Sequence, residues 1–461
     1  MSDSSVLGTA NLSSLLIDHP FGDDEVLLHG STRSWTAGEA RAEVARLCGE
    51  LATAGVPTGA AVAVLGGGCE TVVAMTAIWR HGAVFVPVND RLPDAAVETL
   101  LERTGVAAVV SASTVERRSG STVHDAGAAF ALFTSGTTGE PKAIVHHHDA
   151  YLGIIDRVLG PLSASRDTSK RPSPNLIPVP MALNAGIYNA LFGLRAGAPL
   201  VLMDRFSTAD FAALVRRHEI RSTVLPPASI AMLNDDPDIG DLGPLRYVRS
   251  ITAPLSPFQA RRFTERFGAF VLNGYGQAEF GEVIGWTAAD AKSHPDKIGA
   301  VGKPHPGVEV RIDAPDDRGI GELLVKTAGP LPAGVVETLG DRLDADGFVR
   351  TGDLARLDDG WVWIEGRVGD LINRGGNKVF PDEVEEVLAS VPGVREAAVV
   401  GMPDDRLGEV PVAFVVGDAS DADLEAACRT HLAPYKVPVR YERIDLLPRN
   451  DVGKILRREL Q

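Results

Sequence analysis

The sequence predicts an α/β protein with a large N-terminal domain of doubly wound βαβ subdomains, a small antiparallel β region, and a small α+β domain at the C-terminus. Three observations lead to this prediction. The chain has 461 residues, which is too many for one hydrophobic core. Apolar runs typical of strands alternate with helical patterns. After Gly302 this rhythm changes to short strand candidates separated by turn residues.

The N-terminal part has the pattern of a parallel sheet covered by helices. Short apolar runs alternate with segments whose apolar residues recur at helical spacing, which is typical of βαβ units. The predicted strands are residues 61–65, 83–88, 198–203 and 222–225, and the predicted helices are residues 40–51, 70–80 and 209–218. Residues 119–127 are small and polar and are expected to form an exposed connection.

The C-terminal part has a different pattern. Gly, Pro and Asp separate the strand candidates at residues 308–312, 321–326 and 361–365, which indicates a smaller, more antiparallel region. The segment from Asp370 to Gln461 is long enough for an α+β domain of its own. Its predicted helices are residues 381–389 and 421–431, and its predicted strands are residues 394–402 and 410–416.

The composition excludes several classes of protein. The net charge of -16 disfavours a general nucleic-acid or membrane-surface role, because an acidic surface repels phosphates and anionic lipids. The three cysteines follow no metal-ligand spacing and fit a reducing compartment. The N-terminus lacks a signal-peptide pattern, and no run approaches the roughly 20 apolar residues that span a bilayer. We therefore expect a cytoplasmic protein without a membrane span.

The most informative segment follows the apolar run at residues 128–133. It brings hydroxyl side chains and glycines together, so that N–H and O–H groups can surround a polyphosphate, and a lysine adds positive charge. The string differs from GxxxxGK[ST], and a shorter cluster of this kind would be interpreted as a flexible turn. The predicted phosphate-binding residues are Thr134, Ser135, Gly136, Thr137, Thr138, Gly139 and Lys142.

Four further motifs follow along the chain. They are NGYGQAE at residues 273–279, TGD at 351–353, GRVGDLINRGGNK at 366–378, and PRNDVGKI at 448–455. Each has a plain structural interpretation when taken alone: a turn with a buried tyrosine, a β-turn, an interdomain loop, and a solvated terminal lysine.

Taken together and in this order, the five segments resemble the adenylate-forming superfamily. This superfamily includes the acyl- and aryl-CoA synthetases, firefly luciferase and the adenylation domains of peptide synthetases, and the sequence is most similar to the acyl-CoA synthetases. The resemblance extends from about Trp35 to Leu460. It implies an AMP-binding domain at residues 1–368 and a mobile domain at residues 369–461. It also implies an acid–CoA ligase that uses ATP, Mg²⁺ and coenzyme A, forms an acyl-adenylate, and transfers the acyl group to the thiol of coenzyme A.

The resemblance assigns roles to individual residues. Tyr275 is expected to lie against adenine, and Asp353 and Arg367 to contact the ribose, because a carboxylate suits two adjacent hydroxyls. Glu279 is expected to hold Mg²⁺ and to take part in catalysis, since hard cations prefer carboxylate oxygen. Lys454 is the expected catalytic lysine, which contacts the carboxylate and the α-phosphate in the adenylation transition state.

The resemblance also predicts a hinge and the acceptor, and one residue of this chain differs from the pattern of the family. Asp370 occupies the hinge position, about which the C-terminal domain swings between the two half-reactions. Gly375 and Gly376 resemble the small residues that form the pantetheine tunnel of the CoA ligases, which favours coenzyme A over a carrier protein. Ala278 stands where the family usually has a threonine that contacts the α-phosphate. This loss is expected to affect the rate rather than the type of reaction.

The predicted acid pocket departs from the family at two places. Ala182 and Leu183 stand where acyl-CoA synthetases carry an aromatic residue and then histidine, and paired glycines are replaced at residues 251 and 252. Alanine in place of an aromatic ring opens apolar space, so we predict a bulky, largely apolar acid, of polycyclic or aryl type. The expected pocket residues are Ala182, Leu183, Asn184, Ile251, Thr252 and Gly276.

Two alternatives remain open at this point. The acceptor can instead be the phosphopantetheine of a carrier protein, or the chain can be an inactive ATP-binding relative, an alternative that the alanine at position 278 motivates.

His146, His147 and His148 are expected to lie in a loop or at a strand end rather than to bind a metal, because successive side chains of a strand point to opposite faces.

Overall fold

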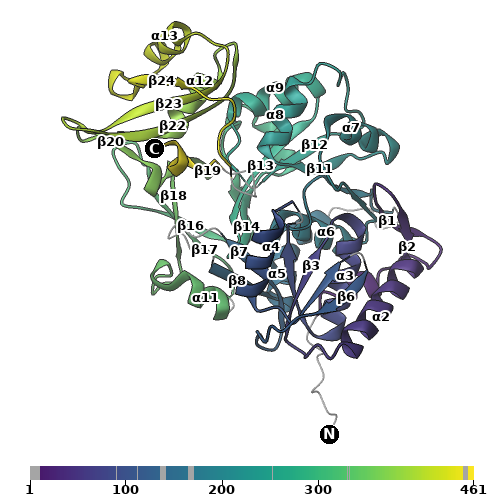
Figure 1. Ribbon diagram of the computed structural model, residues 1–461. Helices are drawn as coiled ribbons and strands as arrows, with labels where there is room; N and C mark the ends of the chain where they lie inside the picture. The colour runs from purple at the N-terminus through teal and green to yellow at the C-terminus, as the bar shows by residue number, and fades with distance from the viewer. Residues whose placement is uncertain are drawn as a thin grey trace.

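The computed structural model describes residues 11–89, 91–111, 113–134, 142–164, 171–251, 253–329, 331, 333–449 and 455–461. The strands of this part form four sheets. In Figure 1 the yellow C-terminal elements lie at the upper left and the purple and blue N-terminal elements at the lower right, and the green strands lie below the yellow elements and to the left of the blue ones. Among the described residues, no helix is long and apolar enough to cross a membrane.

The first sheet is parallel at its centre and antiparallel at both edges, in the order β6-β5-β3-β4-β7-β8. Its central strands are apolar along their whole length because helices cover both faces. The strands are β3 (Ala61–Leu65), β4 (Val84–Val88), β5 (Ala108–Ser111), β6 (Thr114–Arg117), β7 (Ala128–Thr134) and β8 (Lys142–His147). The associated helices are α2 (Ala37–Thr53), α3 (Gly68–His81), α4 (Asp94–Thr104) and α5 (His148–Ala164).

Helix α2 begins three residues before the predicted start. The Thr36 side chain accepts a hydrogen bond from the Glu39 N–H, and the Glu39 carboxylate accepts one from the Thr36 N–H. This capping box satisfies two backbone donors that the first turn leaves free. The cap therefore fixes the start of the helix.

The second sheet has nine strands in the order β15-β14-β13-β12-β11-β9-β10-β1-β2, and the pairs from β1 through β10, β9, β11 and β12 to β13 are parallel. Its strands are β1 (Val26–His29), β2 (Ser34–Thr36), β9 (Asn175–Ile177), β10 (Leu200–Leu202), β11 (Ser222–Leu225), β12 (Tyr247–Ser250), β13 (Phe270–Gln277), β14 (Gly281–Gly285) and β15 (Lys303–Pro304). The helices along this part are α1 (Ser14–Ile17), α6 (Asn184–Arg195), α7 (Thr208–Arg217), α8 (Pro227–Asp235), α9 (Pro257–Phe267) and α10 (Ala288–Ser293).

The third sheet is antiparallel and the fourth belongs to the C-terminal part. The third consists of β16 (Glu309–Asp313), β17 (Gly321–Lys326), β18 (Val349–Asp358) and β19 (Trp361–Arg367), with α11 (Ala333–Leu339) between β17 and β18. The fourth consists of β20 (Ile372–Arg374), β21 (Asn377–Val379), β22 (Val394–Asp404), β23 (Gly408–Gly417) and β24 (Arg440–Arg443), with α12 (Pro381–Ala389) and α13 (Asp421–His431). The chain passes from the third sheet to the fourth through a 3₁₀ turn at Val368–Asp370.

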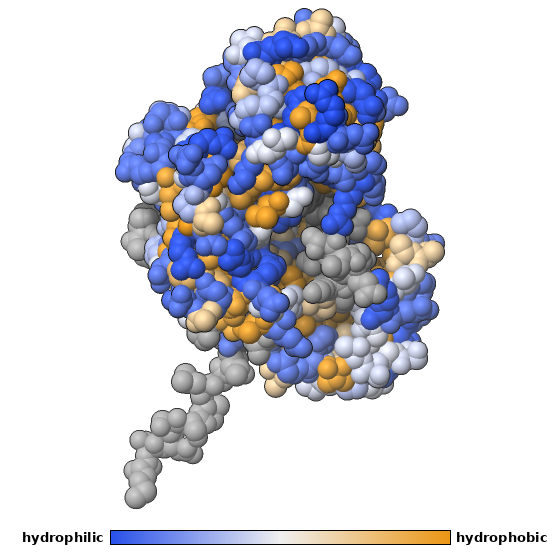
Figure 2. All heavy atoms as spheres, turned by 90° about the vertical axis from the view of Figure 1, so that its left-hand side faces the viewer, coloured by the Kyte–Doolittle hydropathy of each residue, from blue (hydrophilic) through white to orange (hydrophobic). Residues whose placement is uncertain are grey.

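The predicted fold class is therefore confirmed, with parallel sheets first, an antiparallel region next, and an α+β region at the end. The parallel sheets and the C-terminal part have buried apolar clusters of their own, whereas the cluster of the antiparallel sheet also includes residues of β8 and β14. On the face in Figure 2, hydrophobic side chains occur in small separate groups among hydrophilic ones, and the surface is hollowed near its centre, below the uppermost lobe.

Candidate active site

Asp353 is the centre of a hydrogen-bonded cluster formed by three strands. The Tyr275 hydroxyl of β13 donates to Asp353 Oδ2 at 2.6 Å, and Arg367 Nε of β19 donates to Asp353 Oδ1 at 2.8 Å. Asp353 and Arg367 are directly opposite each other in the β18–β19 ladder, so the sheet register brings this pair together. Three residues to which the resemblance assigns contacts with adenosine thus lie together, although up to 92 positions separate them in the sequence (367 − 275).

Gln277 completes this cluster and was not predicted as a site residue. Its Nε2 donates to the Thr351 carbonyl at 2.8 Å and to Asp353 Oδ2 at 3.0 Å. It lies two residues after Tyr275 on β13, so the alternation of the strand puts both side chains on the same face. That spacing was a signal available in the sequence.

The cluster fixes the protonation of its members. Burial, reinforced by the negative charge of Asp353, raises the pKa of the Tyr275 phenol well above its ordinary value. Burial alone would lower the pKa of the Arg367 guanidinium, but the adjacent Asp353 carboxylate more than offsets this and raises it. Tyr275 therefore remains a neutral donor and Arg367 a cation at physiological pH.

Glu279, the expected metal ligand, pairs with an arginine. Arg342 Nη1 contacts Glu279 Oε1 at 2.9 Å, and Arg342 Nη2 donates to Gln277 Oε1 at 2.7 Å. The Glu279 side chain is 12% exposed and that of Arg342 is 41% exposed. Among the described residues, no group of three or more acidic, histidine or cysteine side chains is arranged to hold a metal. One partly buried carboxylate fits Mg²⁺ that arrives with nucleotide phosphates, because Mg²⁺ is commonly held by one or two carboxylates and the substrate.

Three of the predicted acid-pocket residues lie at the start of helix α6. Leu183 is the N-cap of this helix, Ala182 precedes it, and Asn184 Oδ1 accepts a hydrogen bond from the Tyr151 hydroxyl of α5 at 2.7 Å. Ile251 packs against the same apolar cluster as Tyr188 of α6. These contacts place α5, α6 and Ile251 on one apolar cluster.

Gly276 has a structural reason to be glycine. A Cβ at this position would lie 2.1 Å from the carbonyl oxygen of Gly281 on the paired strand β14. Any side chain would therefore separate β13 from β14. The absence of a side chain at Gly276 does not by itself indicate space for an acid.

A partly buried charge cluster lies beside this region and was not predicted. Glu282 of β14 is bonded to Arg249 of β12, and His305 Nε2 lies 3.0 Å from Glu282 Oε1. Burial alone would raise the pKa of the Glu282 carboxyl, but Arg249 and His305 more than offset this and hold it below its ordinary value. The Tyr188 hydroxyl, for which the structure gives no hydrogen-bond partner among the described residues, interacts electrostatically with Glu282 and Arg249.

We expect Glu282→Ala to lower the free energy of unfolding by about 3 kcal/mol, because it leaves a largely buried Arg249 guanidinium without its counterion. Asp235→Ala is the matched control. It removes an ion pair with Arg262 at 2.6 Å whose side chains are 48% and 39% exposed, and it is expected to cost less than about 1 kcal/mol. Urea denaturation of both variants measures the difference, and equal costs would contradict the role given to the buried cluster.

The predicted hinge and glycine pair lie at the start of the C-terminal part. Asp370 Oδ2 is 3.5 Å from Arg457 Nε, and Arg457 also pairs with Asp382 and Glu385 of α12. Gly375 and Gly376 have φ of +58° and +86°, values that favour glycine, and form the turn between β20 and β21. The turn alone thus accounts for these two glycines.

Several predicted residues lie outside the described residues. They are Ser135, Gly136, Thr137, Thr138, Gly139, Thr252 and Lys454. The segments that flank two of these stretches are described. Thr134 pairs with Lys142 at the ends of β7 and β8, and Arg449 pairs with Ile455 on either side of residues 450–454.

His146 and His147 end β8, as expected for a strand end, whereas His148 begins α5, and the three rings contact different partners. The His146 ring stacks on Phe130, His147 Nε2 lies 2.8 Å from Asp125, and His148 Nδ1 accepts a hydrogen bond from the Leu12 N–H. Burial lowers the pKa of His146 to about 4, so this ring is neutral at physiological pH.

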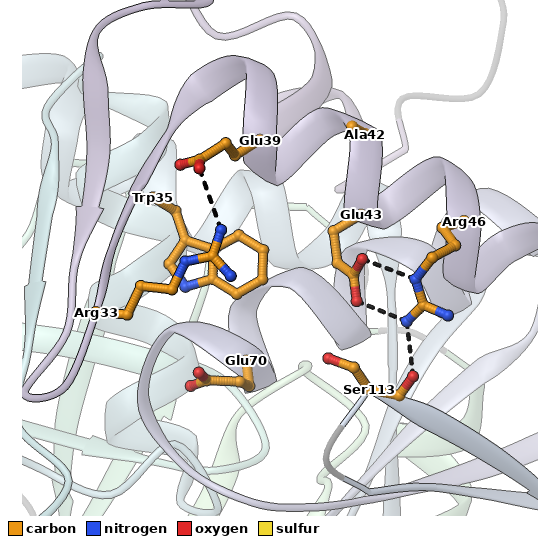
Figure 3. A pocket seen from close by; sticks show the side chains of 8 residues that line it. All are labelled: Arg33, Trp35, Glu39, Ala42, Glu43, Arg46, Glu70 and Ser113. Carbon is orange, nitrogen blue, oxygen red and sulfur yellow. Dashed lines mark hydrogen bonds and ion pairs between the residues drawn. The ribbon is translucent and has the colours of Figure 1, made fainter.

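An open pocket of about 900 Å³ lies elsewhere, between α2, the start of α3 and the β5–β6 turn (Figure 3). The Arg33 guanidinium lies 4.1 Å from the centre of the Trp35 ring and pairs with Glu39, and Arg46 pairs with Glu43. Four of its charged lining residues thus form two ion pairs with one another, and none of its eight lining residues belongs to the predicted site.

Comparison with known proteins gives the family. The model of the AMP-binding enzyme family matches residues 19–126 and 115–332, and that of the AMP-binding enzyme C-terminal domain matches residues 383–454. Together these two matches cover most of the chain and both of its main parts.

The relatives include ligases with different acceptors. A fatty acid–[acyl-carrier-protein] ligase of Streptomyces coeruleorubidus is 34% identical over 72% of this chain and 66% of its own length. A 3-[(3aS,4S,7aS)-7a-methyl-1,5-dioxo-octahydro-1H-inden-4-yl]propanoyl:CoA ligase of Rhodococcus jostii is 35% identical over 72% of this chain and 64% of its own. The matched region thus spans about two thirds of the length of these curated relatives.

A solved structure matches over nearly the whole chain. The o-succinylbenzoate CoA synthetase of Bacillus subtilis, in complex with its acyl-adenylate intermediate, superimposes with a TM-score of 0.82 at 26% identity over 98% of both chains. The fold and the family matches define an adenylate-forming enzyme. The chain belongs to the AMP-binding enzyme family, and its predicted place in the adenylate-forming superfamily, near the acyl-CoA synthetases, is confirmed.

Proposed function

We propose that the protein is an AMP-forming acid–CoA ligase. The observation that carries the proposal is the convergence of Tyr275, Arg367 and Gln277 on the Asp353 carboxylate. A carboxylate with two fixed oxygens suits a pair of vicinal hydroxyls such as those of a ribose. The tyrosine, held neutral by the same network, offers a flat apolar face for a base.

The chemistry has two steps. A carboxylate oxygen of the acid attacks the α-phosphorus of ATP, the bond to the bridging oxygen breaks, and pyrophosphate leaves. The sulfur of the thiol, which loses its proton, then attacks the acyl carbonyl carbon, and AMP leaves with the electron pair of the broken C–O bond. Mg²⁺, when bound, neutralises charge on the phosphate oxygens. We assign Lys454 to charge stabilisation in the first step and Glu279 to holding the metal, as the resemblance implies.

We propose a bulky, largely apolar acid as the substrate. Ala182 in place of an aromatic residue supports this choice, and one relative is named for a bicyclic acid. The buried charges of Arg249 and Glu282 next to Tyr188 neutralise each other, so they do not require an anionic group in the acid.

We further propose that residues 369–461 move as a unit about Asp370. The described chain changes sheets at Val368–Asp370, and the C-terminal sheet has its own core. A carrier protein is the second candidate acceptor, and the carrier-protein ligase among the relatives favours testing it.

The test is ATP-dependent release of AMP and pyrophosphate with a panel of acids that includes polycyclic and aryl acids, acetate and free amino acids. Each acid is assayed alone, with coenzyme A, and with a phosphopantetheinylated carrier protein. Thioester formation on coenzyme A with a large apolar acid is the expected result. Thioester only on the carrier would replace the acceptor, faster turnover with acetate or an amino acid would refute the acid class, and no turnover with any acid would refute the ligase.

A further inference from the structure

Arg342 lies where the sequence gives no reason to expect a cation. It ends the 3₁₀ turn Gly340–Arg342 that follows α11, 63 positions after Glu279. Its guanidinium contacts both the Glu279 carboxylate and the Gln277 side-chain oxygen, and its Nε donates to the Arg350 carbonyl at 2.9 Å. These bonds use three of its five N–H groups, which leaves two for another acceptor.

The residue between the two contacted side chains is Ala278. Its methyl group packs against the apolar cluster that also contains Phe280 and Ile144. A threonine at this position would offer a hydroxyl to the α-phosphate, as the resemblance implies, whereas alanine offers none. Arg342 thus contacts the side chains of both sequence neighbours of Ala278, the position at which a hydrogen-bond donor to phosphate is missing.

The same core connects the helix that precedes Arg342 with the strand that follows the predicted phosphate loop. Val335 and Leu339 of α11 are buried in one cluster with Ile144 of β8. Strand β8 begins at Lys142, the last residue of the phosphate-binding string. The turn with Glu279, strand β8 and the helix that precedes Arg342 are therefore packed on a single core.

We propose that Arg342 is a phosphate-binding residue of the ATP site and takes over the contact that Ala278 lacks. The inference rests on the proposed function, since it requires a nucleotide at Asp353. A planar guanidinium suits phosphate oxygens and remains charged at all relevant pH values. Its pairing with Glu279 keeps this cation in place when no phosphate is bound.

The test is calorimetric binding of ATP and of adenosine in the presence of Mg²⁺, which needs no turnover. Arg342→Ala is expected to raise the Kd of ATP about 10- to 100-fold, the range for a hydrogen bond to a charged group. The Kd of adenosine should change less than about twofold, because adenosine has no phosphate. Arg342→Lys, which keeps the charge but loses the fork, should be intermediate. Ala278→Thr added to Arg342→Ala should restore part of the loss.

Arg311→Ala is the matched control, because Arg311 of β16 pairs with Asp344 at 3.0 Å and its side chain is 46% exposed, similar to that of Arg342. It should leave both Kd values unchanged. An Arg342→Ala variant that binds ATP as tightly as wild type or tighter would show that Arg342 only neutralises Glu279, and would overturn the inference. Parallel weakening of adenosine would overturn it too, as a loss of structure. A wild-type protein that binds no ATP would refute the proposed function and this inference with it.

Discussion

Replacing Lys454 with alanine is expected to slow acyl-adenylate formation about 100- to 1,000-fold, the usual effect of removing one donor aimed at developing transition-state charge. Negative charge shifts onto the α-phosphate and the bridging oxygen as the carboxylate attacks, and a lysine that contacts both groups stabilises this charge more strongly in the transition state than in the ground state. The measurement is single-turnover release of pyrophosphate with saturating acid and ATP.

The second half-reaction provides the internal control for this variant. Thioester formation from a supplied acyl-adenylate should change by less than about threefold, because the thiol attack needs no new bond at phosphorus. Residues 450–454 are flanked by the Arg449–Ile455 bridge, and Leu460 is buried beyond it, so alanine at 454 leaves the anchors of the segment intact. Equal losses in both half-reactions would contradict the assigned role and indicate a folding defect.

The elements that the sequence predicted well are those with local signals. Strands β3 and β17 and helix α12 have the predicted bounds, and each has a turn residue at one boundary: Gly66 follows β3, Gly321 begins β17 and Pro381 begins α12. Strand β13 was not predicted, since FVLNGYGQ contains two glycines and reads as a turn. It is a strand because Gly276 permits close approach to β14, a tertiary contact that no local pattern reveals.

The site residues also divide into those that lie in a recognisable motif and those that do not. Tyr275, Asp353, Arg367 and Glu279 lie in motifs whose resemblance to a family could be seen, and the structure brings the first three together. Arg342 and the Arg249–Glu282–His305 cluster lie in no motif, and each depends on partners between 23 and 63 positions away in the sequence. Only the packing of strands and helices places such charges together, so a single sequence contains no signal for them.

Replacing Asp353 with alanine is expected to raise the Kd of ATP about 100-fold or more, since two hydrogen bonds to a charged group are lost at about 1.5 kcal/mol or more each. Asp353→Asn should cause a smaller loss, because one oxygen remains while the new NH₂ group faces the donors of Arg367 or Gln277. Calorimetric titration of ATP into each variant gives these values.

A nucleotide without ribose hydroxyls distinguishes two roles of Asp353, contact with the ribose and structural support of its neighbours. The nucleotide 2′,3′-dideoxy-ATP lacks both hydroxyls, so it should bind wild type weakly, and Asp353→Ala should weaken it further by less than about threefold if the ribose contact is the lost interaction. Asp313→Ala, which removes one of the two carboxylate partners of Arg350 in the same sheet, should change neither Kd. If Asp353→Ala weakened both nucleotides equally, the carboxylate would act by holding Tyr275 and Arg367 in place, and the ribose would be bound by other residues.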